Sequence, residues 1–341
     1  SFKILLSFVI LIFLLTATVF SLSYYFTLRI METNTIEYTQ KLVNMLKDQV
    51  DSYVSYMDNI SDTFATDPDV KRFLSGGENE AAVREKMHSV SSVRSDISSI
   101  ILFTEDGRAV LDRENAVLNP YADYRKTRWY EQLLASESGY VITSSYVQNI
   151  IQGDYRWVIS MAKTIKDESG AAAGVLLIDL KYDAIEALCA KIKLGETGYV
   201  FILNGNSIVY HPHQQLLYAN ILSESTDLVS RDMRTSFTAI NDATGRYYTV
   251  ETSGMSGWKI AATYDLRELL THRRMVTNAY LLLFMVFLTA GILIAQKLSS
   301  MLTKPIKQLI AGMRRAEQGA FDTKVNITAE DEIGRLASVF N

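Results

Sequence analysis

Two long uncharged apolar segments, one near each end, constrain this chain more than any other feature of its sequence. Between Lys3 and Arg29 stand 25 uncharged residues. Between Arg274 and Lys297 stand 22 more. A helix needs about 20 mostly apolar residues to cross a bilayer, and the apolar part of a cleaved signal peptide is shorter, ~7–15 residues. The sequence therefore predicts two transmembrane helices, the first of them an uncleaved anchor.

The composition excludes several classes of function. A net charge of −4 without a basic stripe argues against nucleic-acid binding. The single cysteine, Cys189, excludes an internal disulfide framework and cysteine-rich zinc sites. His211 and His213 supply only half of a metal site, with no acidic or sulfur ligand beside them. Glycine-rich phosphate loops and nucleophile elbows are absent from the sequence, so we expect no catalytic residues, metal or cofactor in it.

A helical pattern continues from the first apolar segment. Apolar residues recur at alternating spacings of three and four, at Val43, Leu46, Val50, Tyr53, Met57, Ile60 and Phe64. Asp67-Pro68 ends the pattern, because the residue before a proline avoids helical geometry. This apolar stripe is either a dimer seam or a face packed against a sheet.

Two short amphipathic helices are predicted after the second apolar segment. The first opens at Pro305 and the second at Asp331-Glu332-Ile333-Gly334, with an extended connector after Gly319. Their apolar positions are Ile306, Ile310 and Met313, then Phe321, Val325 and Ile327 in the connector, then Ile333, Leu336 and Phe340. This arrangement directly after a membrane span resembles a HAMP domain. The resemblance implies a parallel four-helix bundle formed by two chains, and hence a homodimer.

Between the apolar segments the pattern is mixed α and β, in two successive blocks. The first block has predicted strands at 97–103, 155–165 and 174–180 and a helix at 128–134. The second has strands at 195–203, 207–210, 247–250 and 258–264, the first two joined by an Asn204-Gly205 hairpin turn. The order resembles a double-Cache sensor, most specifically at 198–202 and 208–212. The resemblance implies an α+β fold, with two Cache (PAS-like) lobes on the stalk helix and the ligand in the membrane-distal lobe.

That distal lobe contains the candidate ligand-binding residues. Pockets for small polar ligands combine aromatic walls with a few placed charges. The candidates of this kind are Tyr124, Arg128, Trp129, Tyr130, Tyr146, Trp157 and Asp179. Asp179 ends an apolar strand, where it could receive an ammonium group, and an arginine could bind a carboxylate. Structural roles are the alternative, since Trp129 and Tyr130 could be core residues and Asp179 could cap the following helix.

The candidates are similar to part of the signature of amino-acid-binding double-Cache sensors. The matching positions are Trp129, Tyr130, Tyr146 and Asp179. The sequence departs from the signature at Thr127, where an arginine is expected, and at Gln148, where an aspartate is expected. The ligand class therefore stays open.

The stalk and the tail look like those of YesM-type sensor histidine kinases. That resemblance implies a phosphoacceptor histidine and a kinase core using ATP and magnesium beyond residue 341, since the second HAMP helix stops short at Asn341. We thus expect an input fragment of a two-component system. The alternatives are a methyl-accepting chemotaxis receptor, with the same sensor and HAMP, and a stand-alone binding or adhesion module.

Together these patterns predict a multi-pass protein of the bacterial cell membrane, with the sensor extracellular and HAMP cytoplasmic. Its expected partners are a second copy, contacted through HAMP and stalk, an extracellular small molecule, the membrane and a cognate response regulator, but no nucleic acid. The expected parts are a first span at 1–28, stalk helix at 29–74, membrane-distal lobe at 75–190, membrane-proximal lobe at 191–272, second span at 275–296 and truncated HAMP at 297–341.

Overall fold

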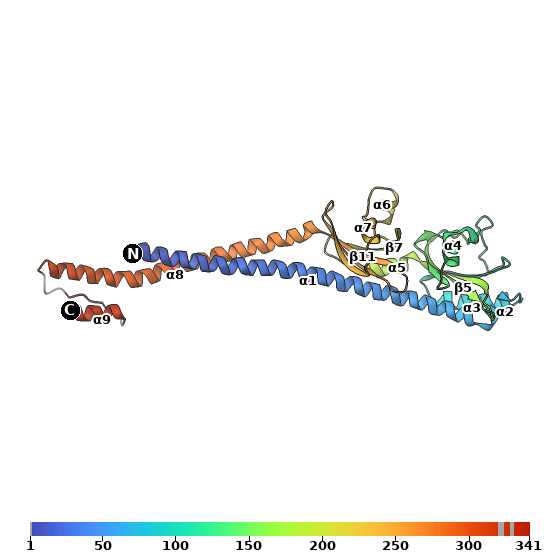
Figure 1. The fold of residues 1–341 in the computed structure, drawn as a ribbon, viewed down its shortest axis with the longest axis horizontal. Coiled ribbons are helices and arrows are strands. Elements are labelled where there is room, and N and C mark those ends of the chain that lie inside the picture. The colour runs from blue at the N-terminus through green and yellow to red at the C-terminus, as the bar shows by residue number, and fades with distance from the viewer. Residues whose placement is uncertain (1, 320–323, 328–330) are drawn as a thin grey trace. The chain divides into compact units, whose positions relative to one another are not determined.

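The computed structural model describes residues 2–319, 324–327 and 331–341, without the side chains of Phe2, Ile4 and 266–272. The chain divides into two compact units (Figure 1). One unit comprises residues 1–33 and 270–341, and the other comprises residues 34–269. Helix α1 (Phe2–Thr66) begins in the first unit and continues into the second.

The larger unit consists of two lobes, each built on an antiparallel sheet. In the first lobe, α2 (Pro68–Leu74) and α3 (Glu80–Val93) precede a sheet with the strand order β2-β1-β6-β5-β3, and β4 also pairs with β5. The strands are β1 (Ile97–Thr104), β2 (Ala109–Leu111), β3 (Tyr140–Ile142), β4 (Tyr146–Val147), β5 (Trp157–Lys166) and β6 (Ala172–Lys181). Between β2 and β3 lie the 3-10 helix η1 (Tyr124–Lys126) and α4 (Arg128–Leu134). The predicted strands and the predicted helix at 128–134 are confirmed, whereas α3 was not expected.

The second lobe follows α5 (Tyr182–Cys189) and has a five-stranded sheet with the order β8-β7-β11-β10-β9. Its elements are β7 (Tyr199–Asn204), β8 (Ser207–Tyr210), α6 (Gln214–Tyr218), α7 (Thr226–Ser230), β9 (Ser236–Asn241), β10 (Arg246–Thr252) and β11 (Lys259–Asp265). The predicted hairpin is confirmed, and Gly205 supplies its left-handed turn with φ 58°. The α+β class with two lobes is therefore correct.

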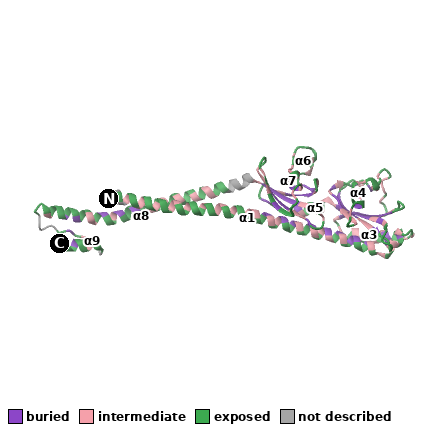
Figure 2. Ribbon diagram, in the orientation of Figure 1, coloured by how far each residue is buried: buried purple, intermediate pink, exposed green. Residues whose placement is uncertain are grey.

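One face of α1 packs along both sheets, as Figures 1 and 2 show. The residues of the apolar stripe belong to one core that includes Ile178 of the first sheet and Ile260 of the second. Outside this core, Lys163 Nζ lies 2.7 Å from Asp58 Oδ1, and Gln40 Nε2 donates to Glu251 Oε1 at 2.9 Å. The stripe is thus the face that packs against the sheets.

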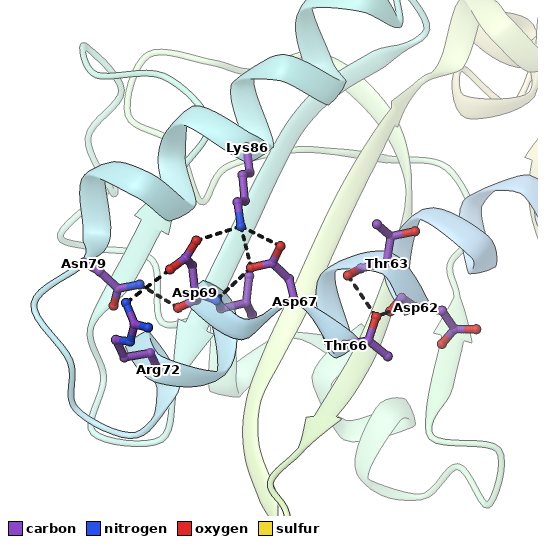
Figure 3. Close-up of polar contacts among 9 residues, drawn as sticks. Asp62, Thr63, Thr66, Asp67, Asp69, Arg72, Asn79 and Lys86 are labelled. Atoms are coloured by element: carbon purple, nitrogen blue, oxygen red, sulfur yellow. Dashed lines mark hydrogen bonds and ion pairs between the residues drawn. The ribbon is translucent and has the colours of Figure 1, made fainter.

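Helix α1 ends where the sequence predicts, and the polar cluster at this end is shown in Figure 3. Asp67 caps α2, because its Oδ1 accepts the N–H groups of Asp69 at 2.8 Å and Val70 at 3.2 Å. Lys86 of α3 points at the same carboxylate, with Nζ 2.6 Å from Asp67 Oδ2. This cap and ion pair fix the turn from the long helix into the first lobe.

Replacing Asp67 with alanine is expected to lower the free energy of unfolding by about 1–2 kcal/mol, the usual cost of losing a helix cap. Arg72→Ala is the control, because the Arg72 side chain is 66% exposed and its ion pair with Asp69 should contribute little. Urea unfolding of the full chain in detergent, followed by tryptophan fluorescence, measures both. Equal losses in the two variants would contradict the capping role.

Gly198 makes the closest backbone approach in the second lobe. A Cβ at this position would collide with the Leu194 carbonyl oxygen and lie 2.6 Å from the Leu194 Cβ. Gly198→Ala is therefore expected to destabilise the chain by about 2–3 kcal/mol through overpacking. Gly254→Ala is the matched control, because nothing lies within 4 Å of a Cβ there. Thermal melting of both variants tests this, and a Gly198→Ala melt as high as that of the control would refute it.

The smaller unit contains both candidate membrane spans. Helix α1 and helix α8 (Leu266–Glu317) are long and apolar enough to cross a bilayer, and almost none of their apolar windows is buried in the protein. They contact each other through aromatic rings, with Phe20 and Phe284 centroids 5.7 Å apart. Tyr24 Oη and Thr277 Oγ1 are hydrogen-bonded at 2.8 Å.

The tail departs from expectation at its proline. Pro305 does not begin a helix but lies inside α8, which runs unbroken from the span into the tail. The residues on both sides of Pro305 favour a helix strongly enough to offset the loss of the one backbone hydrogen bond that a proline cannot make. Residues 324–327 have no helix or strand, and Val325 exchanges two hydrogen bonds with the Asn341 side chain beyond α9 (Glu332–Phe340), at 2.7 and 2.9 Å. The predicted connector residue Phe321 lies outside the described residues.

Candidate ligand-binding site

Strand β6 divides its side chains between two faces of the first sheet. Leu176, Ile178 and Leu180 belong to the core on the α1 side, whereas Leu177 belongs to a second cluster on the opposite face. Because side chains alternate along a strand, Asp179 shares the face of Leu177. Asp179 is fully buried there, so a carboxyl group lies beneath an otherwise apolar and aromatic layer.

Two serines hold the Asp179 carboxyl group. Ser99 of β1 donates to Oδ2 at 2.7 Å, and Ser160 of β5 donates to Oδ1 at 2.5 Å. Both serines pair directly with Asp179 in the sheet register. Complete burial raises the pKa of Asp179 to about 6, although the hydrogen bonds from Ser160 and Ser99 act in the opposite direction. Asp179 does not cap α5, since Lys181 occupies the N-cap position, so that alternative is wrong.

Aromatic side chains form the wall of the site. Tyr124 stacks on Phe103 at 4.0 Å between centroids, and Trp129 and Tyr130 both contact Tyr124. Tyr146 packs against the same cluster, and its hydroxyl is 2.8 Å from Ser160 Oγ. Of the predicted residues, Tyr124, Trp129, Tyr130, Tyr146 and Asp179 therefore share one face of one sheet.

Two buried donors of this layer lack acceptors among the residues that the structure describes. Trp129 is 3% exposed and Gln148 is 1% exposed, yet neither Trp129 Nε1 nor Gln148 Nε2 makes a hydrogen bond. Gln148 Oε1 accepts the Ile151 N–H at 3.1 Å, and its amide lies beside Asp179 without completing a bond to it. A buried donor without an acceptor costs about 1–3 kcal/mol, so a ligand that supplies oxygen atoms would recover this energy.

Two predicted residues lie elsewhere. Arg128 is exposed at the start of α4, and the hydrogen bonds to the carboxyl group of Asp179 come from Ser99 and Ser160 instead. Trp157 stands on β5 an odd number of positions from Ser160, so it projects from the other face, where it contacts Tyr182 and Tyr218. Thr127, at the position where the amino-acid signature has arginine, donates to the Tyr124 carbonyl at 2.5 Å and so closes a local turn.

Sequence reasoning missed Ser99 and Ser160 and treated Gln148 only as a departure from a signature. The available signal was a serine among the apolar residues of each of two predicted strands. Such residues need a hydrogen-bond partner when buried, and both serines find one in Asp179. Which strands neighbour one another could not be read from the sequence.

A second buried polar cluster occupies the second lobe. Glu224 accepts hydrogen bonds from Tyr199 at 2.5 Å, Tyr248 at 2.7 Å and His211 Nε2 at 3.2 Å. His211 Nδ1 accepts the His213 N–H at 3.0 Å, which leaves the ring proton on Nε2. Burial alone would raise the pKa of Glu224, but these hydrogen bonds outweigh it and lower the pKa to about 2. The His211 side chain is therefore a hydrogen-bonded member of this cluster.

Comparison with known families matches two regions of the chain. The sequence profile described as Cache domain matches residues 27–272, and the profile described as HAMP domain matches residues 297–341. Methyl-accepting chemotaxis protein TlpB of Bacillus subtilis (strain 168) is 25% identical over 303 residues, which cover 89% of this chain and 44% of the relative. McpC of the same strain is 24% identical over 351 residues, 98% of this chain and 50% of the relative. The chain thus spans about half the length of the curated relatives it matches.

Solved structures share the fold. The ligand-binding domain of Pseudomonas fluorescens chemoreceptor CtaA, in complex with L-isoleucine, superposes with a TM-score of 0.54 at 16% identity, covering 72% of this chain and 98% of that one. The ligand-binding domain of Mlp24 with asparagine gives a TM-score of 0.55 at 18% identity, with 73% and 99% covered. At these identities the likeness establishes the arrangement of lobes and strands.

Proposed function

Since the chain belongs to the Cache domain family and carries a HAMP domain, we propose that it is the sensing half of a bacterial chemotaxis receptor. The relatives that match most of the chain are methyl-accepting chemotaxis proteins. They do not support the expected YesM-type kinase, and they favour the alternative reading of the sequence. In this proposal the two spans lie in the cell membrane, the lobes face outward and HAMP lies in the cytoplasm.

The observation that carries the proposal is the buried carboxyl group of Asp179, on the same side of the sheet as two buried donors without acceptors. A carboxylate and nearby N–H donors are what a small molecule with both an ammonium group and an oxygen-bearing group requires. Asp179 would bind the ammonium group, and Trp129 Nε1 and Gln148 Nε2 would donate to the oxygen atoms. Amino acids have this chemistry, and CtaA and Mlp24 bind them in the solved complexes. Because Thr127 stands where the signature has arginine, we propose that neutral N–H donors take the place of the guanidinium.

A route for the signal begins next to this site. Tyr146 is hydrogen-bonded to Ser160, while its neighbour Ser145 donates to the Ile208 carbonyl of the second lobe at 3.3 Å. Asn204 returns a hydrogen bond to the Ile142 carbonyl at 3.2 Å. A ligand that binds one arrangement of the site better than another shifts the population between them. We propose that these contacts pass that shift to the second lobe and through α8 to HAMP, where a second copy completes the bundle.

The test is made with the full-length receptor in a swimming bacterium that lacks its own chemoreceptors. Expression should restore accumulation toward at least one amino acid in a capillary assay, and Asp179→Ala should remove that response. Restored swimming bias without any response to the twenty amino acids would leave a chemotaxis receptor with another ligand class. Failure to couple to the flagellar motor at all would exclude the chemotaxis output.

One observation favours a second candidate. Sensor protein SrrB of Staphylococcus aureus (strain NCTC 8325 / PS 47) is 32% identical over 77 residues, although these cover only 23% of this chain. The sequence beyond Asn341 separates the two outputs. Unbroken heptads indicate a chemotaxis receptor, whereas a phosphoacceptor histidine followed by an ATP-binding domain, with a cognate response regulator, indicates a kinase.

A further inference from the structure

An open cleft separates the two lobes on the side of Trp157. Its volume is about 680 Å³, within the range of small-molecule sites. Aromatic rings from both lobes line it, with Trp157 of the first lobe 5.6 Å from Tyr218 of the second and 6.4 Å from Tyr182 of α5. Trp157 is 40% exposed and Tyr218 is 60% exposed, so their rings offer apolar area to a ligand.

The polar groups of this inter-lobe cleft balance one another. Arg156 is already paired with Asp154 through two hydrogen bonds of 2.7 and 2.6 Å, and Lys181 donates to the Ser95 carbonyl at 2.6 Å. The side-chain carboxylates of Asp183 and Glu186 form no ion pair or hydrogen bond with any residue that the structure describes. The cleft therefore offers two unpaired carboxylates, while its arginine is already paired with Asp154.

The charged groups of the cleft disfavour strongly charged ligands. An anion would meet two free carboxylates, and the arginine that could bind it is engaged by Asp154. An organic cation binds best when it lies over the face of an aromatic ring and several such rings enclose it. Here the rings pack against one another, tilted by 38° for Trp157 and Tyr218, and Arg156 and Lys181 line the same space.

We propose that the inter-lobe cleft is a second binding site, for a neutral polyhydroxylated ring such as a monosaccharide. A sugar has an apolar C–H face that packs on an aromatic ring and hydroxyl groups that both donate and accept. Its hydroxyls would donate to Asp183 and Glu186 and accept from the Lys181 ammonium group, which has three N–H donors and gives one to Ser95. Because the walls come from both lobes, such a ligand would stabilise their present arrangement. The proposal does not depend on what binds at Asp179.

The described chain offers a separate reporter for each site. Its three tryptophans are Trp129 at the Asp179 site, Trp157 in the cleft and Trp258 in the core of the second lobe. The full chain, labelled with 5-fluorotryptophan and placed in lipid nanodiscs, should give three ¹⁹F resonances. The variant Trp157→Phe identifies the one from the cleft. The probes are D-glucose, D-galactose and D-ribose, with choline and citrate as charged comparisons, each to about 20 mM, enough to saturate a millimolar site.

At least one sugar should shift the Trp157 resonance in a saturable way and leave that of Trp129 in place. Tyr218→Ala should raise the Kd of that sugar about tenfold. Tyr121→Ala, at a tyrosine that is 96% exposed and lies outside the cleft, should leave the Kd unchanged. A shift with choline or citrate alone, or none with any sugar, overturns the proposal. A sugar that shifts Trp129 instead would overturn it too, and would place sugar binding at the Asp179 site.

Discussion

Replacing Asp179 with asparagine is expected to weaken binding of an ammonium-bearing ligand at least about 100-fold, because the ligand cation would be buried without its countercharge. The fold should persist, since asparagine has the same size, its amide oxygen can accept from one of the two serines, and its NH2 group can donate to the hydroxyl oxygen of the other. Calorimetric titration of the full chain with the amino acid identified by the capillary assay measures the loss. Arg128→Ala is the matched control, because Arg128 is exposed and should leave the Kd within about twofold.

The same variant tests the pH dependence. The folded pKa of Asp179, about 6, lies above its ordinary value of 3.8. Its contribution to stability is therefore complete below about pH 4 and is lost as the pH rises through 6. Binding of an ammonium group needs the carboxylate. The affinity should therefore fall as the pH drops below about 6, because the carboxyl group of the free protein is then protonated and must release its proton on binding. Asp179→Asn should remove both dependences, and an unchanged pH profile in this variant would refute the role of Asp179.

Replacing Glu224 with alanine is expected to cost about 3–5 kcal/mol of unfolding free energy, the largest stability effect that the structure predicts. The change leaves three buried donors, on Tyr199, Tyr248 and His211, without an acceptor. Tyr248→Phe removes one hydrogen bond of the same cluster and should cost only about 1 kcal/mol. Urea unfolding of the two variants and the native chain gives the comparison.

The sign of the pH effect at Glu224 is opposite to that at Asp179. The folded pKa of Glu224, about 2, lies below its ordinary value of 4.5. Its contribution is therefore present above about pH 4.5 and is lost as the pH falls toward 2. Glu224→Gln should flatten the stability profile in that acid window. If Glu224→Ala unfolded no more easily than Tyr248→Phe, the role of Glu224 as the common acceptor of the three donors would be refuted.

The sequence was most informative where the pattern is local. The stripe from Val43 to Phe64, the helix at 128–134 and the Asn204-Gly205 hairpin depend on spacing or turn chemistry within a few residues, and each is present. Asp179 was predicted as a site residue because a carboxyl group at the end of an apolar strand could receive an ammonium group. The burial of that group and its hydrogen bonds agree with the expectation, while its role in binding stays a prediction.

What the sequence could not give is the order of strands. Ser160 lies opposite Asp179, and Ser99 lies on its other side, only because β6 is between β1 and β5. Trp157 was predicted for the same site as one of the aromatic residues of the distal lobe, yet alternation along β5 places its side chain on the other face. The continuity of α8 through Pro305 was missed because a proline signals a boundary locally, whereas the helical segments on both sides decide.

Because the stripe of α1 is common to both sheets, the two lobes share one core on that side, beside a smaller apolar cluster on the other face of each sheet, and should melt as one cooperative body. A ligand bound only in the first lobe would then protect slowly exchanging amides of β7 and β11 in the second by the same free energy. Hydrogen exchange with and without ligand measures this, and protection confined to the first lobe would show that they open independently. Evolution of a new ligand specificity in one lobe therefore changes the stability margin of the other.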